Sequence, residues 1–361
     1  MTDPIFPRIE RSFQGARIFV TGHTGFKGSW LAAWLHILGA EVTGYALPPE
    51  HEEGHFNALA LSRRVHHIEG DTRDACGLKA AVAKAHPQFI FHLAAQPLVR
   101  RSYAQPRLTF ETNIMGSVNL LEAVRECKSA PVVIYVTSDK CYADQQWPWG
   151  YRESDLLGGN DPYSASKACA EFIFASYHQS YFGASRIRCA TVRAGNVIGG
   201  GDWSEDRIIP DCMRALRAGR PIQIRNPESV RPWQHVLEPI SGYLALAASL
   251  AADEVPSGQS WNFGPATGAH RSVKELVEGV IGRWGSGTTE ICPAADATQK
   301  ESNTLYLNCE KAWHALGWSA RWSFHRTVEM TADWYRCRSL GVDAWKLTSG
   351  QIAAYSEASR D

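Results

Sequence analysis

The chain has no excess charge of one sign, no membrane-length apolar run and no leader-like N-terminal segment. Its 361 residues include 37 lysines and arginines against 37 aspartates and glutamates, which argues against nucleic acid or an acidic membrane as a partner. The apolar stretch Tyr243–Ala252 is shorter than the ~20 residues that cross a bilayer, and the N-terminus lacks the apolar core of a signal peptide. We therefore expect a soluble cytoplasmic protein.

Metal-binding and disulfide patterns are also missing. The nine cysteines are odd in number and contain no CxxC pair, which is typical of reduced thiols in a cytosolic protein. The 13 histidines, including the neighbours His66 and His67, do not have the spacing of metal ligands. We predict that the protein binds no metal.

The first half of the chain alternates short β-rich runs with helical patterns. This alternation predicts an α/β fold of the Rossmann type, in which a doubly wound parallel sheet is covered by helices on both faces. A dinucleotide-binding domain is expected at residues 1–194 and a smaller α/β substrate-binding domain, interwoven with the first, at residues 195–361. The predicted strands are 16–21, 41–47, 65–69, 89–93, 132–137 and 186–192, and the main helices are 26–38, 108–127, 162–182, 272–282 and 326–335.

A glycine-rich turn joins the first predicted strand to the first helix. In its GxxGxxG spacing, Gly22 permits a tight turn, Gly25 lets a pyrophosphate approach the backbone, and Gly28 allows the helix to pack closely on the strand. The N–H groups at the helix N-terminus then face the phosphates. Glycine turns alone are common, but this one, between a strand and an amphipathic helix, predicts a dinucleotide site made of Gly22, His23, Thr24, Gly25, Phe26, Lys27 and Gly28.

The residues leave the choice between NAD and NADP open. The second predicted strand ends at Tyr45-Ala46-Leu47, without the acidic residue that usually binds a ribose hydroxyl. Glu50 lies two prolines further on, and either His23 or Lys27 would favour a nearby phosphate. Asp71, after the third strand, is expected to accept a hydrogen bond from the adenine amino group, with a helix N-cap as the alternative.

A second motif, YxxxK, places Tyr163 and Lys167 on one face at the start of a predicted helix. A neighbouring ammonium is expected to lower the pKa of the tyrosine from about 10, so that the phenolate becomes a usable base. Because YxxxK also occurs by chance on exposed helices, this interpretation depends on the glycine turn and on the hydroxyl of Ser138 at a strand end.

In their order along the chain, these motifs resemble those of the extended short-chain dehydrogenase/reductase family. The resemblance covers nearly the whole chain and includes the strand end Phe91–Ala95 and the segments 192–199 and 231–236. It implies a Rossmann domain and bound NAD, with NADP not excluded, contacted also by Leu93, Ala94 and Ala95. It further implies a nucleotide-sugar substrate and a homodimer or tetramer.

The turn Ser138-Asp139-Lys140 resembles the active turn of the nucleotide-sugar 4,6-dehydratases in this family. The lysine in its third position resembles the turn of those members that use CDP-glucose, in deoxysugar and lipopolysaccharide biosynthesis. The resemblance implies that Tyr163, assisted by Lys167, removes the proton of the 4-hydroxyl, which the hydroxyl of Ser138 or Thr137 contacts. Lys140 then removes the proton on carbon 5 as a neutral amine, which requires an enclosed position beside Lys167 and the cofactor that lowers its pKa, and Asp139 protonates the leaving 6-hydroxyl. The last role requires a carboxyl with a raised pKa.

The substrate's diphosphate and ribose need polar partners of their own. Guanidinium groups suit phosphate oxygens, although a single arginine is more often a solvated surface residue. The candidates are Arg193, Asn196, Arg207, Arg231 and His235.

Two other functions fit part of this pattern. A nucleotide-sugar 4-epimerase or ketoreductase would keep Tyr163 and Lys167 but would not need Asp139. A non-catalytic dinucleotide-sensing protein of the same fold would not need Tyr163, Lys167 and Ser138 together.

Overall fold

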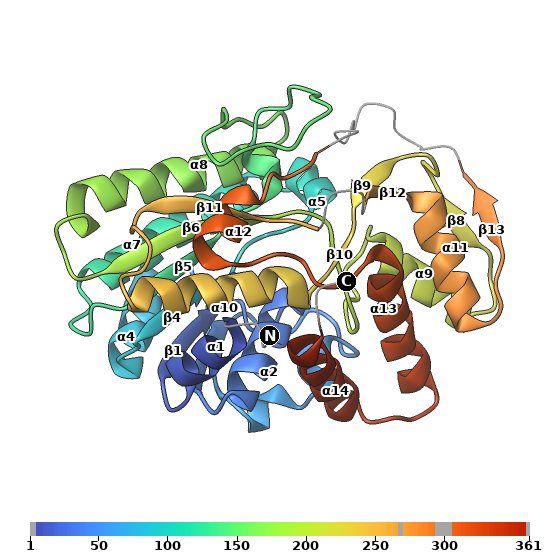
Figure 1. Cartoon of the computed structure of the whole chain (residues 1–361), viewed down its shortest axis with the longest axis horizontal. Helices are drawn as coiled ribbons and strands as arrows, with labels where there is room; N and C mark the ends of the chain where they lie inside the picture. Colours follow the sequence, from blue (N-terminus) through green and yellow to red (C-terminus); the bar gives the residue numbers. More distant parts are fainter. Residues whose placement is uncertain (1–4, 266–269, 293–304, 359–361) are drawn as a thin grey trace.

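A seven-stranded sheet forms the centre of the computed structural model, which describes residues 5–265, 270–292 and 305–358 (Figure 1). Its strand order is β11-β6-β5-β4-β1-β2-β3, and every neighbouring pair is parallel. The predicted Rossmann fold is therefore confirmed. The strands are β1 (Arg17–Thr21), β2 (Glu41–Ala46), β3 (His66–Glu69), β4 (Phe89–His92), β5 (Val132–Val136), β6 (Arg188–Ala194) and β11 (Gln259–Phe263).

The two faces of the sheet enter two separate hydrophobic cores. Ile18 and Val20 of β1 belong to one core and Phe19 to the other, because successive side chains of a strand point to opposite faces. Helices α2 and α10 cover the first face, and α4, α7 and α8 cover the second (Figure 1). Their bounds are α2 (Phe26–Ile37), α4 (Ala75–Ala85), α7 (Gly116–Arg125), α8 (Pro162–Tyr177) and α10 (Leu237–Ala251).

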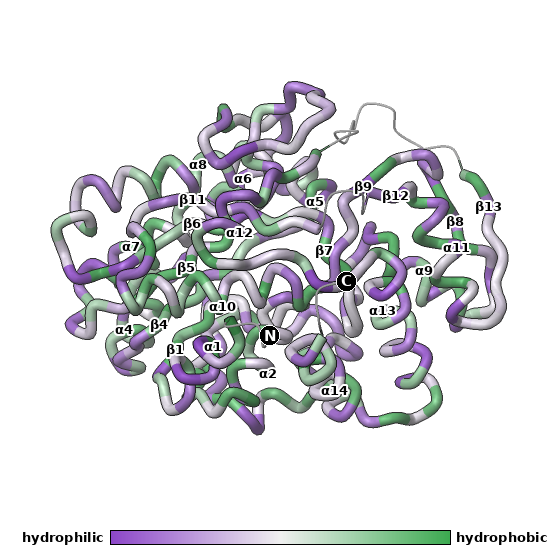
Figure 2. The backbone as a smooth tube through the Cα atoms, viewed as in Figure 1, coloured by the Kyte–Doolittle hydropathy of each residue, from purple (hydrophilic) through white to green (hydrophobic). Residues whose placement is uncertain are grey.

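The apolar run near the middle of the sequence belongs to α10. Every residue from 237 to 250 is buried, as expected for a helix that is apolar on all sides and lies in a core. Figure 2 shows this helix mostly in hydrophobic colours, whereas the outer helix α8 mixes hydrophobic and hydrophilic residues. Within the described ranges, no helix combines the length and hydropathy of a membrane span.

Several elements differ from the sequence prediction. The predicted helix 108–127 is divided by the π-helical turn η2, and the predicted helix 162–182 ends in a second π-turn, η4. Helix α1, with Ile5, Phe6, Ile9 and Phe13 buried, was not predicted. These elements are α1 (Ile5–Phe13), α6 (Pro106–Phe110), η2 (Glu111–Met115) and η4 (His178–Phe182).

A smaller lobe lies beside the sheet and contains α9, α11, α13 and α14 (Figure 1). The chain returns from it to the sheet through α10 and β11. The division at residue 194 into two interwoven domains stays a prediction. The larger elements of this part are α9 (Ile208–Arg217), β8 (Ile222–Ile224), β9 (Val230–Pro232), β12 (His270–Ser272), α11 (Val273–Trp284), β13 (Thr289–Ile291), α13 (Phe324–Ser339) and α14 (Ala344–Glu357). The remaining short elements are α3 (His55–Ala58), η1 (Leu61–Arg63), α5 (Val99–Ala104), η3 (Asp139–Cys141), β7 (Val197–Ile198), β10 (Gln234–His235) and α12 (Glu310–Leu316).

Candidate active site

The glycine turn has the geometry of a phosphate cradle. Gly22 has φ +75°, and a Cβ atom there would lie 2.7 Å from the backbone nitrogen of Ala94. At Gly28 a Cβ atom would lie 2.1 Å from the carbonyl oxygen of Gly22, so only glycine lets α2 start this close to β1. Gly25 is the N-cap of α2 and provides no side-chain cap, which leaves the first N–H groups of the helix facing outward. This cradle fits a dinucleotide pyrophosphate.

Other predicted cofactor residues lie around the cradle. Leu93, Ala94 and Ala95 follow β4 directly, and the Thr21 hydroxyl accepts a hydrogen bond from the Ala94 N–H over 3.2 Å. Thr24 donates its hydroxyl to the carbonyl of Leu47 over 2.9 Å. The partly buried backbone of residues 93–95 thus lies against the glycine turn.

His23 does not provide a charge for a phosphate. Its ring is fully buried, with Nε2 2.7 Å from Nδ1 of His67. Burial, and then the charge of His67, lower the pKa of His23 to about 3, so the ring is neutral. It fills the space that glycine leaves at position 44, where a Cβ atom would lie 2.3 Å from the imidazole.

The two acidic residues considered for the adenosine half are both bound to arginines. Asp71 accepts hydrogen bonds from the backbone N–H and the guanidinium of Arg73, and Glu50 pairs with Arg101. The alternative of Asp71 as a helix N-cap is wrong, because Asp74 caps α4 by accepting from the N–H of Gly77. Asp71 remains a proposed adenine ligand.

The active turn is buried directly after β5. The Ser138 hydroxyl donates to Oδ1 of Asp139 over 2.9 Å, and Ser138 also caps the short helix η3 by accepting from the N–H of Lys140. Burial raises the pKa of Asp139, against the lowering effects of Lys140, the Ser138 hydroxyl and Lys27. A carboxyl with a raised pKa is what a proton donor near neutral pH requires. Lys140 is only partly buried, in contrast to the enclosed position that we expected.

YxxxK lies in the first turns of α8, which begins at Pro162 and is capped by Asp161. Burial raises the pKa of Tyr163 to about 12, against the hydrogen bond with Ser138. In the chain alone this pKa is therefore raised, in contrast to the lowering expected from a neighbouring ammonium, because removal from water outweighs the positive charge of Arg207. Burial also lowers the pKa of Lys167 to about 8, and its ammonium donates to the carbonyl of Val136 over 3.4 Å.

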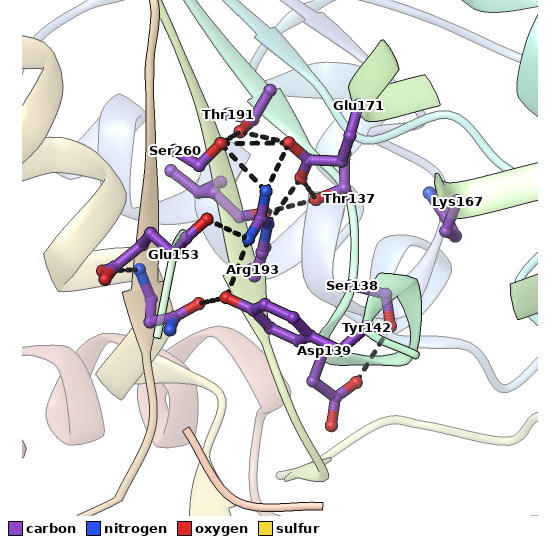
Figure 3. A network of polar contacts seen from close by, with 12 residues as sticks. Thr137, Ser138, Asp139, Tyr142, Glu153, Lys167, Glu171, Thr191, Arg193 and Ser260 are labelled. Carbon is purple, nitrogen blue, oxygen red and sulfur yellow. Dashed lines mark hydrogen bonds and ion pairs between the residues drawn. The ribbon is translucent and has the colours of Figure 1, made fainter. Parts of the chain in front are cut away.

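A buried polar network lies next to the active turn (Figure 3). The carboxylate of Glu171 accepts two hydrogen bonds from the guanidinium of Arg193, at 2.8 and 2.9 Å. It also accepts the Thr137 hydroxyl at 2.5 Å, and Arg193 donates to the Tyr142 hydroxyl at 2.7 Å. Thr137 precedes η3 and Tyr142 follows it, so the network holds both ends of the active turn.

Arg193 and His235 are not available to the substrate. Besides Glu171 and Tyr142, Arg193 binds the hydroxyl of Ser260 and the carbonyl of Glu153, so its guanidinium is used within the protein and we withdraw it as a diphosphate ligand. The His235 ring is fully buried, with its centroid 5.6 Å from that of Trp30 and 4.8 Å from that of Trp322. It belongs to the core, and burial lowers its pKa to about 3.

The three other residues predicted to bind the substrate remain candidates. Arg207 is the residue before α9, forms an ion pair with Asp202 over 3.1 Å and is close enough for its charge to lower the pKa of Tyr163. Asn196 follows β6 and is partly buried, while Arg231 lies on β9 opposite Arg271 of β12. All three remain proposed ligands.

Two residues near the site were not predicted from the sequence. Glu171 is four residues after Lys167 on α8, so the helical spacing that joins Tyr163 to Lys167 would have pointed to it one turn later. Tyr243 lies in the apolar run of α10 and had no distinguishing pattern, yet Asp139 and Tyr163 both influence its pKa. Their roles depend on contacts between distant segments.

The parallel sheet, the glycine cradle and the buried serine, tyrosine and lysine define a Rossmann enzyme of the extended short-chain dehydrogenase/reductase class. A family profile described as GDP-mannose 4,6 dehydratase matches residues 19–331, and the chain belongs to this family.

Individual relatives agree with this assignment. CDP-glucose 4,6-dehydratase of Salmonella typhimurium is 42% identical over 356 residues, which cover 97% of this chain and 99% of that protein. dTDP-glucose 4,6-dehydratase of Streptomyces antibioticus is 28% identical over 331 residues, covering 88% and 92%. The solved structure of dTDP-glucose 4,6-dehydratase from Streptomyces venezuelae with NAD bound has a TM-score of 0.76 and 24% identity, and covers 91% of this chain and 100% of that chain. This last likeness concerns the fold.

Proposed function

We propose that the protein is an NAD-dependent CDP-glucose 4,6-dehydratase, which converts CDP-glucose to CDP-4-keto-6-deoxyglucose and water. The 42% identity to the Salmonella enzyme over 97% of the chain supports the substrate. The observation that carries the reaction type is Asp139, a buried carboxyl with a raised pKa at the carboxyl end of β5, where doubly wound folds bind their ligands.

Each proton transfer of this reaction is assigned to a different residue of the chain. Tyr163 takes the proton of the 4-hydroxyl, which Ser138 orients, while Lys167 supplies positive charge beside the phenol. The glycine cradle would hold NAD, which would supply a hydride acceptor for carbon 4 and a hydride donor for carbon 6. Lys140 removes the proton on carbon 5 and Asp139 protonates the departing 6-hydroxyl; when hydride reaches carbon 6, Lys140 returns its proton to carbon 5.

The first test is incubation of the purified protein, with NAD, with CDP-glucose and separately with dTDP-glucose. Mass spectrometry detects the loss of water, and absorbance in alkali detects the 4-keto-6-deoxy sugar. Product from CDP-glucose alone is the expected result. A 4-epimer without loss of water would favour the epimerase function instead, and product from dTDP-glucose alone would refute the assigned substrate.

The variant Asp139→Asn tests the acid role. Loss of a general acid is expected to slow dehydration by about 10²–10⁴-fold, while hydride transfer from carbon 4 to the cofactor, followed by single-turnover absorbance, is retained. Equal loss of both steps would contradict the assigned role.

We also propose a homodimer and a cytoplasmic location. Exposed apolar side chains gather on neighbouring helical segments, with Phe110 36% exposed, Met115 50% and Phe172 59%. Such a group is typical of a helix-mediated interface. All nine cysteines are free, in agreement with a reducing compartment. A deoxysugar for lipopolysaccharide is one destination that we propose for the product.

A further inference from the structure

The two oxygen atoms of the Asp139 carboxyl have different neighbours. Oδ1 accepts a hydrogen bond from the Ser138 hydroxyl over 2.9 Å. Oδ2 lies against Gly195, since a Cβ atom added to this glycine would be 2.9 Å from Oδ2 and 3.7 Å from Cγ of Asp139. Asp139 is 5% exposed, and its side chain points away from the pair of Glu171 and Arg193 (Figure 3). The carboxyl therefore occupies the space that a side chain at position 195 would take.

No backbone conformation demands a glycine at position 195. Its φ is not positive, so a residue with a Cβ atom can adopt the same backbone. Cγ of Pro232 on β9 would lie 3.5 Å from the added Cβ atom, which is an ordinary contact between carbon atoms. The carboxyl oxygen of Asp139 is therefore the group that an alanine would displace.

The backbone that carries Gly195 is fixed relative to the active turn. Gly195 directly follows β6, and Arg193 of this strand donates to the Tyr142 hydroxyl over 2.7 Å. At the other end of the turn, the N–H of Thr137 donates to the carbonyl of Val192 over 2.9 Å. Because hydrogen bonds join β6 to both ends of the turn, the easiest response to a Cβ atom at position 195 is rotation of the short side chain between them, which is that of Asp139.

The elimination depends on where this carboxyl points. After Lys140 has taken the proton on carbon 5, the electron pair forms the bond between carbons 5 and 6. The bond between carbon 6 and its oxygen breaks, and that oxygen takes the proton of Asp139 and leaves as water. A general acid must lie within hydrogen-bond reach of the atom that it protonates, so a turned carboxyl stops this step alone.

We propose that Gly195 is a positioning residue for the proton donor: the absence of a Cβ atom leaves the space in which the Asp139 carboxyl stays bonded to Ser138 and faces the leaving oxygen. This inference rests on the proposed dehydratase function. It explains the glycine after β6 by the position of the acid rather than by the shape of the backbone.

The variant Gly195→Ala tests this role. A displacement of the acid by ~1 Å is expected to lower kcat for dehydration on the order of 10²-fold, while hydride transfer from carbon 4 to the cofactor in a single turnover is retained. In Asp139→Asn the donor is already absent, so the added Gly195→Ala is expected to slow dehydration no further. A general disturbance of the structure would instead slow both steps and both backgrounds.

Infrared spectroscopy of the carboxyl provides a readout that does not depend on turnover. The band of protonated Asp139, assigned by its disappearance in Asp139→Asn, is expected to move to higher frequency in Gly195→Ala, because the carboxyl loses the hydrogen bond from Ser138. Ser138→Ala gives the reference position of the band without this bond. The control Gly350→Ala of α14, with nothing within 4 Å of the added Cβ atom, leaves the band and kcat unchanged. Circular dichroism is expected to show Gly195→Ala folded, with a melting temperature close to that of the wild type.

The outcomes separate this inference from the function on which it rests. Wild-type protein without dehydratase activity overturns the proposed function, whatever the infrared band shows. An active wild type with an unchanged band in Gly195→Ala, or dehydration by this variant at the wild-type rate, overturns the role of Gly195. Equal loss of hydride transfer and dehydration also refutes it. A Gly195→Ala protein that fails to fold would show that the strand moves instead of the carboxyl, which contradicts the proposal as well.

Discussion

Loss of the Arg193 guanidinium is predicted to destabilise the protein more than loss of any exposed arginine. The side chains of Arg193 and Glu171 are 2% and 3% exposed. In Arg193→Met the carboxylate of Glu171 stays buried without its cation, and the hydroxyls of Thr137 and Thr191 are its remaining donors, together with Ser260. Breaking one side of a buried pair costs about 3–5 kcal/mol.

The cost converts into a measurable shift in melting temperature. For 361 residues, the average unfolding entropy of about 2.1 cal/mol/K per residue gives about 0.76 kcal/mol/K, so 3–5 kcal/mol corresponds to about 4–7 °C. Although burial alone would raise it, the hydrogen bonds and charge of Arg193 lower the pKa of Glu171 from 4.5. The stabilisation is therefore fully present above pH 4.5 and is lost as pH falls through the lowered value.

Thermal unfolding followed by circular dichroism, together with urea titration, measures the effect at neutral pH. The double variant Arg193→Met, Glu171→Gln removes the unpaired charge and is expected to recover about 1–3 kcal/mol relative to Arg193→Met. Arg107→Met, at a residue whose side chain is 90% exposed in its ion pair with Glu111, serves as the control and leaves the melting temperature close to that of the wild type. A coupling near zero between positions 171 and 193 would refute the reasoning.

Two further predictions concern the cradle and the outer helices. Gly28→Ala places a Cβ 2.1 Å from the carbonyl oxygen of Gly22. It is expected to cost about 1–3 kcal/mol of stability and to weaken NAD binding in equilibrium dialysis. The control Gly282→Ala, with open space around it, is expected to do neither, and normal NAD binding by Gly28→Ala would exclude the close approach. Phe172→Glu is expected to shift the protein from dimer to monomer in light scattering, and Leu340→Glu, at another exposed apolar residue, is not; two equally dimeric variants would place the interface elsewhere.

The parts of the site that depend on short sequence spacing were predictable. The glycine turn and YxxxK each bring their members together within a few residues, so the local backbone alone places Gly22 against Gly28 and Tyr163 near Lys167. Asp71 and Asp74 differ by three residues, and only the start of α4 decides which of them is the cap. Spacing therefore located the helix end without identifying the capping residue.

The partners that lie far apart in the sequence could not be predicted. Arg193 has a guanidinium suited to a phosphate, but Glu171 of α8 and Ser260 of β11 lie beside it in the folded chain. Their oxygen atoms accept hydrogen bonds from its N–H groups. His235 was selected for its polarity, although Trp30 and Trp322 enclose its ring. A polar side chain at a strand end thus serves either the ligand or the core, and tertiary packing determines which.

Burial favours the neutral form of two of the three proposed proton-transfer groups in the chain alone. It raises the pKa of Tyr163 to about 12 and raises that of Asp139 as well. The neutral form is the one that Asp139 needs as an acid, but Tyr163 needs the opposite form as a base. Additional positive charge beside the phenol is therefore required before the first step, because the charge of Arg207 does not outweigh burial. The raised pKa of Asp139 favours proton donation in the elimination, whereas the oxidation at carbon 4 would need positive charge beside Tyr163, which the oxidised nicotinamide ring of a bound NAD would supply.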